Sequence, residues 1–129
     1  MRVITLKQPW ATLVAEGLKK YEFRSWKYNY RGEILIHAGK GIDETAMSKF
    51  KDLNLEFPTS RIVAKVNIVD CIELNQEVNK KIILENQLVY GNKIDRTGYA
   101  WVLNNVKKIN SDKVVSGKQG IWNIDTEII

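Results

Sequence analysis

The chain begins with an apolar segment and then a helical pattern, which together predict a strand followed by a short helix. Residues 3–6 form the strand candidate. Residues 9–17 begin with proline and end with glycine, which suit the first turn and the end of a helix. Between them, Trp10, Leu13 and Val14 recur at helical spacing and are expected to form its buried face.

Further along, β-branched and alternating segments predict more strands, separated by polar segments. The strand candidates and extended segments are residues 19–26, 33–38, 61–74, 98–106 and 121–125. The helix candidates are residues 44–53, capped by Asp43, and a weaker one at residues 76–85. Loops are expected at residues 39–41 and 113–120. The strands do not alternate regularly with helices, so a doubly wound parallel sheet is excluded. The pattern favours an α+β fold, a curled barrel of five to six mostly antiparallel strands flanked by two to three helices.

Composition suits one globular domain over residues 1–129, with 44% apolar and 27% charged residues. No apolar run is long enough to span a bilayer, and the N-terminus lacks a signal-peptide pattern, so no membrane partner is expected. Cys71 is the sole cysteine, which leaves no internal disulfide and favours a cytoplasmic location. A single histidine and a single cysteine make a zinc site of the usual kind unexpected, and no cofactor or metal is indicated.

The net charge of +5 is unevenly distributed along the chain. Residues 1–40 hold eight Lys and Arg against three Glu, whereas residues 41–129 hold twelve residues of each sign. Clustered positive charge attracts phosphate-bearing partners. A basic face that serves only solubility explains the same pattern, and charge alone does not separate the two interpretations.

Residues 17–26 are the segment most concentrated in polar chemistry. In an extended chain Glu22 and Arg24 point to one face and Lys19 to the other. A turn or bulge after Gly17 would bring the three together. Glu22 and Arg24 would then form an ion pair, and Lys19 would contact phosphate or, if desolvated, act as a base. The competing interpretation is a solvated strand with surface charges.

The spacing Gly17-x-Lys19-x-x-Glu22-x-Arg24 matches the signature of the activating signal cointegrator homology (ASCH) domains in full, and the chain resembles this family. The resemblance extends to four neighbouring blocks: residues 6–11, 24–26, 30–32 and 34–38. Residues 118–122 resemble the family's closing strand. The resemblance implies a fold similar to PUA (pseudouridine synthase and archaeosine transglycosylase) domains, with the signature residues lining a cleft. It also implies binding of RNA or another nucleic acid.

Some ASCH domains are enzymes, and the resemblance therefore raises a second possibility. One branch hydrolyses 4-acetylcytidine with Lys, Thr and Glu, and others are ribonucleases. Lys19 matches the lysine of the first branch, but Glu22 stands where that branch has its threonine and cannot replace a hydroxyl nucleophile. Glu73 and Glu77 are loose candidates for the acidic partner. Lys19 and Glu22 are accordingly the catalytic candidates if the chain is a hydrolase.

Three functions follow from the sequence. The first is RNA binding, with stacking by Trp26 or Tyr30. The residues expected to contact the nucleic acid are Lys19, Glu22, Arg24, Trp26, Tyr30, Arg31, His37 and Lys40. For His37 the alternative is a satisfied core histidine. The second function is hydrolysis of a modified nucleoside or of RNA. The third is a protein-interaction module whose basic face binds an acidic partner. The sequence does not indicate an oligomeric state.

Overall fold

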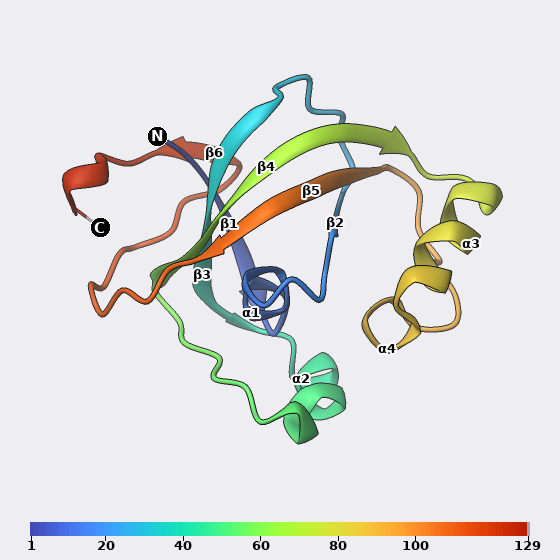
Figure 1. Cartoon of the computed structure of the whole chain (residues 1–129), viewed down its shortest axis with the longest axis horizontal. Helices are drawn as coiled ribbons and strands as arrows, with labels where there is room; N and C mark the ends of the chain where they lie inside the picture. The colour runs from blue at the N-terminus through green and yellow to red at the C-terminus, as the bar shows by residue number, and fades with distance from the viewer. Residues whose placement is uncertain (129) are drawn as a thin grey trace.

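Six strands form one curled sheet in the computed structural model, which describes residues 1–128 (Figure 1). The strands are β1 (Arg2–Gln8), β2 (Tyr21–Arg24), β3 (Gly32–Ile42), β4 (Arg61–Glu73), β5 (Tyr99–Lys108) and β6 (Ile121–Asn123). Their order across the sheet is β2-β5-β4-β3-β1-β6, and every neighbouring pair is antiparallel except β1 and β3. The predicted α+β fold with a curled, mostly antiparallel sheet is confirmed, although the sheet does not close into a barrel.

Among the described residues, four α-helices pack against the sheet, one more than predicted. They are α1 (Trp10–Ala15), α2 (Glu44–Phe50), α3 (Gln76–Glu85) and α4 (Gln87–Tyr90), with 3-10 turns η1 (Lys51–Leu53) and η2 (Thr126–Ile128). The Asp43 side chain caps α2 as expected by accepting from the backbone N–H of Ala46 at 3.0 Å. The extra helix, α4, is a single turn that Asn86 caps. In the part of the chain described, no helix is long and apolar enough to cross a membrane.

The curled sheet wraps around α1, which lies inside its concave face (Figure 1). Ala11, Val14 and Ala15 of α1 belong to the main core together with apolar residues of β1, β3, β4 and β5. On β3, Ile34 faces this core, whereas Leu35 faces a second core that contains Trp122. The central position predicted for this strand, with apolar residues on both faces, is thus confirmed.

The loop predicted at residues 39–41 is wrong, because β3 continues through these residues to Ile42. Pairing with β1 extends from Leu6 opposite Ala38 to Gln8 opposite Ile42, so β3 carries two extra residues in a bulge. Glycine at positions 39 and 41 marks this bulge and not the end of the strand. Lys40, exposed at the centre of the bulge, therefore projects from the sheet and not from a loop.

Candidate functional site

The turn after α1 sets the geometry of the signature. Gly17 has a φ of +76°, a left-handed conformation that favours glycine, and its N–H donates to the carbonyl of Val14 at 3.0 Å. The N–H of Lys19 turns back to the carbonyl of Leu13 at 3.0 Å. Lys19 therefore lies ahead of β2 and does not follow the strand alternation that would place it opposite Glu22. The turn after Gly17 brings the three signature side chains together.

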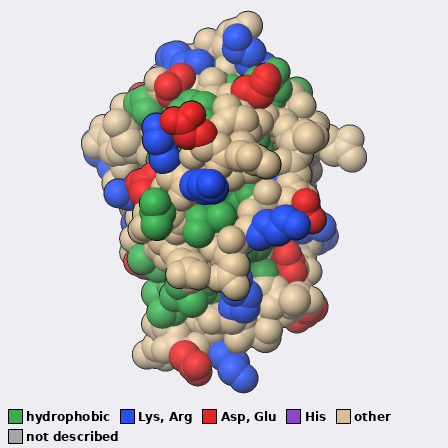
Figure 2. Space-filling model, turned by 90° about the vertical axis from the view of Figure 1, so that its right-hand side faces the viewer, with side chains coloured by type: hydrophobic (Ala, Val, Ile, Leu, Met, Phe, Trp, Pro, Cys, Tyr) green, Lys and Arg blue, Asp and Glu red, His purple; other side chains and the backbone are tan. Residues whose placement is uncertain are grey.

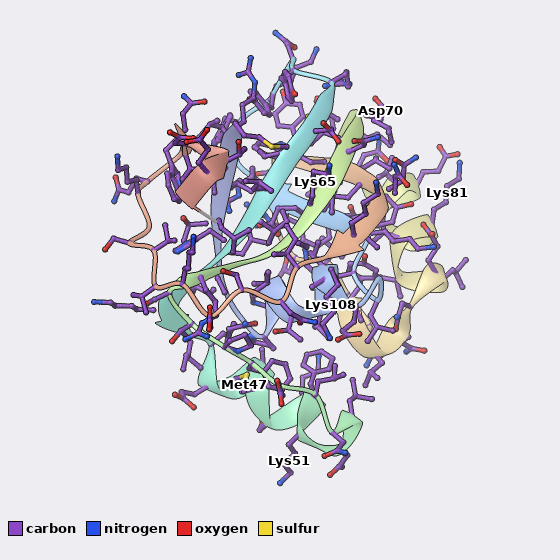
Figure 3. All side chains as sticks on the ribbon, turned by 60° about the vertical axis from the view of Figure 1, so that its left-hand side comes forward. Met47, Lys51, Lys65, Asp70, Lys81 and Lys108 are labelled. Atoms are coloured by element: carbon purple, nitrogen blue, oxygen red, sulfur yellow. The ribbon has the colours of Figure 1, made fainter. Side chains whose placement is uncertain are left out.

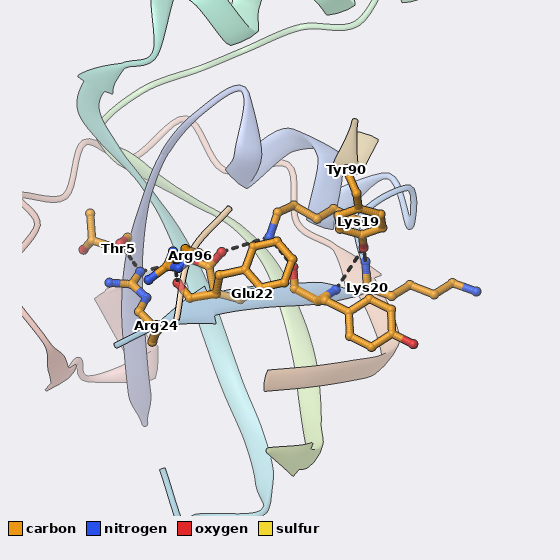
Figure 4. Close-up of polar contacts among 9 residues, drawn as sticks. Thr5, Lys19, Lys20, Glu22, Arg24, Tyr90 and Arg96 are labelled. Carbon is orange, nitrogen blue, oxygen red and sulfur yellow. Dashed lines mark hydrogen bonds and ion pairs between the residues drawn. The ribbon is translucent and has the colours of Figure 1, made fainter. Parts of the chain in front are cut away.

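Glu22 is the centre of a three-residue ion network (Figure 4). Its Oε1 lies 2.9 Å from Lys19 Nζ, and its Oε2 lies 3.1 Å from Arg24 Nη2. Lys19 Nζ also donates to the carbonyl of Tyr21. The ion pair expected between Glu22 and Arg24 is present, and Lys19 completes it.

Arg24 also bridges the open seam of the curled sheet. Its Nη2 donates to the carbonyl of Thr5 at 3.3 Å, which joins β2, one edge of the sheet, to β1, near the other edge. Its Nε is buried and has no hydrogen-bond partner among the described residues. The signature thus lies where the sheet fails to close, and the Arg24 guanidinium links the two sides of the seam.

A cavity of about 470 Å³ occupies this seam and is lined by Lys19, Glu22 and Arg24, the three signature side chains. We call it the signature cavity. The aromatic residues Trp10, Phe23 and Tyr90 and the basic residues Lys7 and Arg96 also line it, together with Thr5, Leu6 and Val89. Tyr90, from α4, is held in place because its hydroxyl accepts from the N–H groups of Lys20 at 2.8 Å and Tyr21 at 3.1 Å. The cavity therefore combines an ionic floor with aromatic walls.

Most of the charged residues that line the cavity are basic. Burial alone would raise the pKa of Glu22, but the charges and hydrogen bonds of Lys19 and Arg24 outweigh it and hold that pKa below its ordinary value. Glu22 is therefore ionised at neutral pH. Among the described residues, it is the only acidic one that lines the cavity, against four basic ones. The lining therefore carries more positive than negative formal charge.

The family model of the ASCH domain matches residues 4–113, which include this whole network. The chain belongs to the ASCH domain family. The curled sheet is consistent with the PUA-like fold that the resemblance implied. The chain is also similar to activating signal cointegrator 1 of Mus musculus and of Homo sapiens, at 23% identity over 137 residues in each case. These alignments cover 97% of this chain but 22% of each relative, so the chain spans about a fifth of their length.

Several residues that line the signature cavity were not predicted from the sequence. Trp10 was interpreted as core, but it is half-buried: its ring packs edge-on against Phe50 at 6.0 Å, and the side chain also lines the cavity. Lys7 and Trp10 lie in the block of residues 6–11 that resembles the family, which was the available signal. Tyr90 and Arg96 come from a distant segment that carried no signal in the sequence.

Three residues predicted to contact nucleic acid do not line the signature cavity: Trp26, Tyr30 and Arg31. All three lie between β2 and β3. The ring of Trp26 packs against that of Trp101 with centroids 4.9 Å apart, and the Arg2 guanidinium lies 4.0 Å above the Tyr30 ring. Arg31 is held by the carbonyls of Tyr28 and Tyr30 and lies 3.7 Å from Asp70. These residues form a separate aromatic and basic surface.

His37 and Lys40 also lie outside the signature cavity, as do Glu73 and Glu77. His37 is fully buried, and its ring nitrogens contact Thr5 Oγ1 and the carbonyl of Val115. The core-histidine interpretation describes this environment better than a position beside Glu22. Within residues 1–128, no three His, Cys, Asp or Glu side chains are grouped so as to hold a metal ion.

The lowered pKa of Glu22 predicts a pH-dependent contribution to stability. Because the pKa is lower in the folded than in the unfolded chain, the stabilisation is complete above its ordinary value of 4.5 and is lost as pH falls through the folded value. Urea unfolding of wild type and Glu22→Gln should therefore show a stability difference that is constant near neutrality and shrinks in acid. A difference that stays constant down to the acid limit would contradict the assigned network.

Proposed function

We propose that this ASCH domain binds single-stranded RNA and holds one nucleotide in the signature cavity. The observation that carries the proposal is the combination, in one cavity of about 470 Å³, of aromatic walls with an ionic floor that offers donors and an acceptor. Aromatic faces stack on any base, at about 1–3 kcal/mol per base. Trp10, Phe23 and Tyr90 supply such surfaces, and the Glu22 carboxylate and Arg24 supply groups for a base edge.

The shape of the site favours single-stranded RNA over duplex RNA. A base reaches aromatic walls in a cavity only when it is unstacked and unpaired, which excludes the interior of a duplex. The RNA backbone remains outside, where Lys7 and Arg96 line the cavity and meet phosphate oxygens. Arg96 is the better placed of the two for a base as well, since its guanidinium lies 6.0 Å from the Phe23 ring centroid.

The charge of the face that carries α3 and α4 is consistent with contacts to only a few phosphates. On the face that carries α3 and α4, basic side chains are interspersed with acidic ones around exposed hydrophobic side chains (Figure 2). No continuous basic surface extends across this face. Affinity should therefore fall with salt by an amount that corresponds to a small number of phosphate contacts.

Neutralising the cavity's two peripheral basic residues tests the proposal without disturbing the buried network. Lys7→Gln with Arg96→Gln should weaken binding of a short single-stranded RNA and reduce the slope of log affinity against log salt by about 1.4, the contribution of two phosphates on a single strand. The matched control is Lys51→Gln with Lys81→Gln, which removes the same charge from outward-pointing side chains that do not line this cavity (Figure 3). Equal losses in the two double variants would contradict the proposal.

Hydrolysis of a modified nucleoside is the second candidate, favoured by one distance. Lys19 Nζ and Glu22 Oε1 lie 2.9 Å apart in the same cavity, so both reach one point, as general acid–base chemistry on a bound water requires. Release of acetate from 4-acetylcytidine by wild type but not by Lys19→Ala would establish it. Binding that survives loss of Lys19 and is indifferent to nucleotides would instead favour the protein-interaction module.

A further inference from the structure

A second hollow of about 420 Å³ lies between the β1–β3 pair and the loop that precedes β6. Besides Thr5 and His37, two lysines, two serines and a glutamine line it: Lys40, Lys118, Ser60, Ser116 and Gln119. Among the described residues, no acidic one lines it. Ammonium, hydroxyl and amide donors without a carboxylate are the groups that bind a phosphate.

Two glycines that line the hollow allow the chain to approach its floor closely. A Cβ on Gly117 would lie 2.9 Å from His37 Cε1, and one on Gly39 would lie 2.7 Å from Thr5 Cγ2. Both distances are shorter than carbon atoms tolerate without a shift of the neighbour. The loop and the bulge of β3 therefore approach the floor closely only because these positions lack side chains.

The floor is a hydrogen-bonded chain with fixed donors. His37 Nε2 lies 2.6 Å from the carbonyl of Val115, which only accepts, so this nitrogen carries the proton. In the neutral ring Nδ1 then accepts from the Thr5 hydroxyl at 3.1 Å, and that hydroxyl accepts from Trp122 Nε1 at 3.0 Å. Burial lowers the pKa of His37, although its bond to Val115 opposes the shift, which agrees with the neutral ring. The floor is thus satisfied, and the lysines above it are free for a ligand.

Neither lysine is neutralised by a neighbouring side chain. The ion pairs found among the described residues involve neither Lys40 nor Lys118. Lys118 Nζ lies 5.9 Å from the Trp122 ring centroid, and Lys40 is exposed in the bulge. Two unpaired ammonium groups over a hollow without carboxylates make a local positive field.

The two hollows are neighbours along the open edge of β1. The strand β6 pairs only with Arg2–Ile4, so no strand pairs with this side of β1 from Thr5 onwards, where the Arg24 guanidinium donates to the Thr5 carbonyl. Thr5 lines both hollows. Lys7 lines the signature cavity, and its Cγ lies 3.2 Å from the Cβ position of Gly41, next to Lys40. An RNA strand that leaves the signature cavity along this edge therefore reaches the second hollow.

We propose that the second hollow binds a backbone phosphate of the same RNA strand whose nucleotide occupies the signature cavity. This inference rests on the proposed function and adds a second subsite to it. Lys40 and Lys118 neutralise the phosphodiester, and the serine hydroxyls and Gln119 donate to its oxygens. A mononucleotide in the signature cavity leaves the second hollow empty, whereas a longer strand fills both.

The test compares binding of uridine monophosphate and of oligouridylates of increasing length. Wild type should gain affinity with length. Lys40→Gln with Lys118→Gln should bind the mononucleotide as wild type does but lose most of the gain with length, and its salt slope for the longer strand should fall by about 0.7, the contribution of one phosphate. The double variant Lys51→Gln with Lys81→Gln should retain both. Amide signals of Gly39 and Gly117 should shift with inorganic phosphate in wild type but not in the Lys40 and Lys118 variant.

The outcomes separate this inference from the function on which it rests. A mononucleotide that binds wild type, with a gain in affinity over length that the Lys40 and Lys118 variant keeps, overturns the second subsite and leaves the proposed function standing. Failure of wild type to bind any of the nucleotides overturns the proposed function. It also overturns the proposal that one RNA strand occupies both the signature cavity and the second hollow. If the gain in affinity with oligonucleotide length is lost in the Lys40 and Lys118 variant alone, the result supports both the second subsite and the proposed function.

Discussion

Glu22→Ala should lower the free energy of unfolding by about 3–5 kcal/mol, the usual loss when one partner of a buried ion pair is removed. The substitution leaves two cations without their shared counterion. Of these, Lys19 has a side chain only 4% exposed, so water cannot replace the carboxylate. The bridge from Arg24 to Thr5 across the seam also loses the carboxylate that orients it. Urea unfolding at neutral pH measures the loss.

The control for this prediction is a similar pair on the surface. Glu16 lies 2.6 Å from Lys108, whose side chain is 52% exposed. Exposed pairs contribute about 0–1 kcal/mol, so Glu16→Ala should cost far less than Glu22→Ala. Similar losses from the two substitutions would mean that burial does not strengthen the signature network, and the electrostatic account of the cavity would be wrong.

Trp101→Ala should cost about 3–5 kcal/mol, because it removes a large side chain from the main core. Trp101 is 1% exposed, and its ring lies 4.9 Å from that of Trp26 and 5.0 Å from that of Tyr28. Loss of this support should also loosen the segment between β2 and β3. Thermal or urea unfolding measures the first effect, and amide hydrogen exchange of residues 25–31 measures the second.

An exposed apolar residue provides the comparison for Trp101. Leu84 on α3 is 85% exposed, and Leu84→Ala should change stability by no more than about 0.5 kcal/mol. A loss below about 1 kcal/mol for Trp101→Ala would contradict the position assigned to its ring in the core.

The elements that the sequence predicts well are those whose pattern is local. The alternating β-branched run at residues 61–74 became β4, and residues 76–85 became α3 with the predicted bounds. Asp43 caps α2 because an N-cap depends only on residues three positions away. Local patterns were also enough to exclude a doubly wound sheet.

What the sequence did not predict depends on contacts between distant segments. Residues 39–41 read as a loop, yet pairing with β1 continues the strand through a bulge. Tyr90 and Arg96 reach the cavity because α4 and the chain after it pack beside β2, a placement that no local pattern encodes. The position of Lys19 was undecided in the sequence, since a single turn at Gly17 determines which way its side chain faces.

The clustering of charge in the first 40 residues is not a cluster in space. Lys7, Lys19 and Arg24 line the signature cavity, but Lys40 lines the second hollow. Arg31 lies beside Asp70 on a third surface. Charge density along the sequence therefore could not delineate a site.

The four tryptophans can show where a nucleotide binds, because each of them reports on a different place. Trp10 lines the signature cavity, Trp26 lies on the aromatic surface after β2, Trp101 is in the core, and Trp122 lies under the second hollow. Indole N–H signals should be followed by NMR while uridine monophosphate is added. A nucleotide bound in the signature cavity predicts a saturable shift of the Trp10 signal while the other three stay in place. A shift of Trp26 with Trp10 unmoved would place the nucleotide elsewhere and contradict the account.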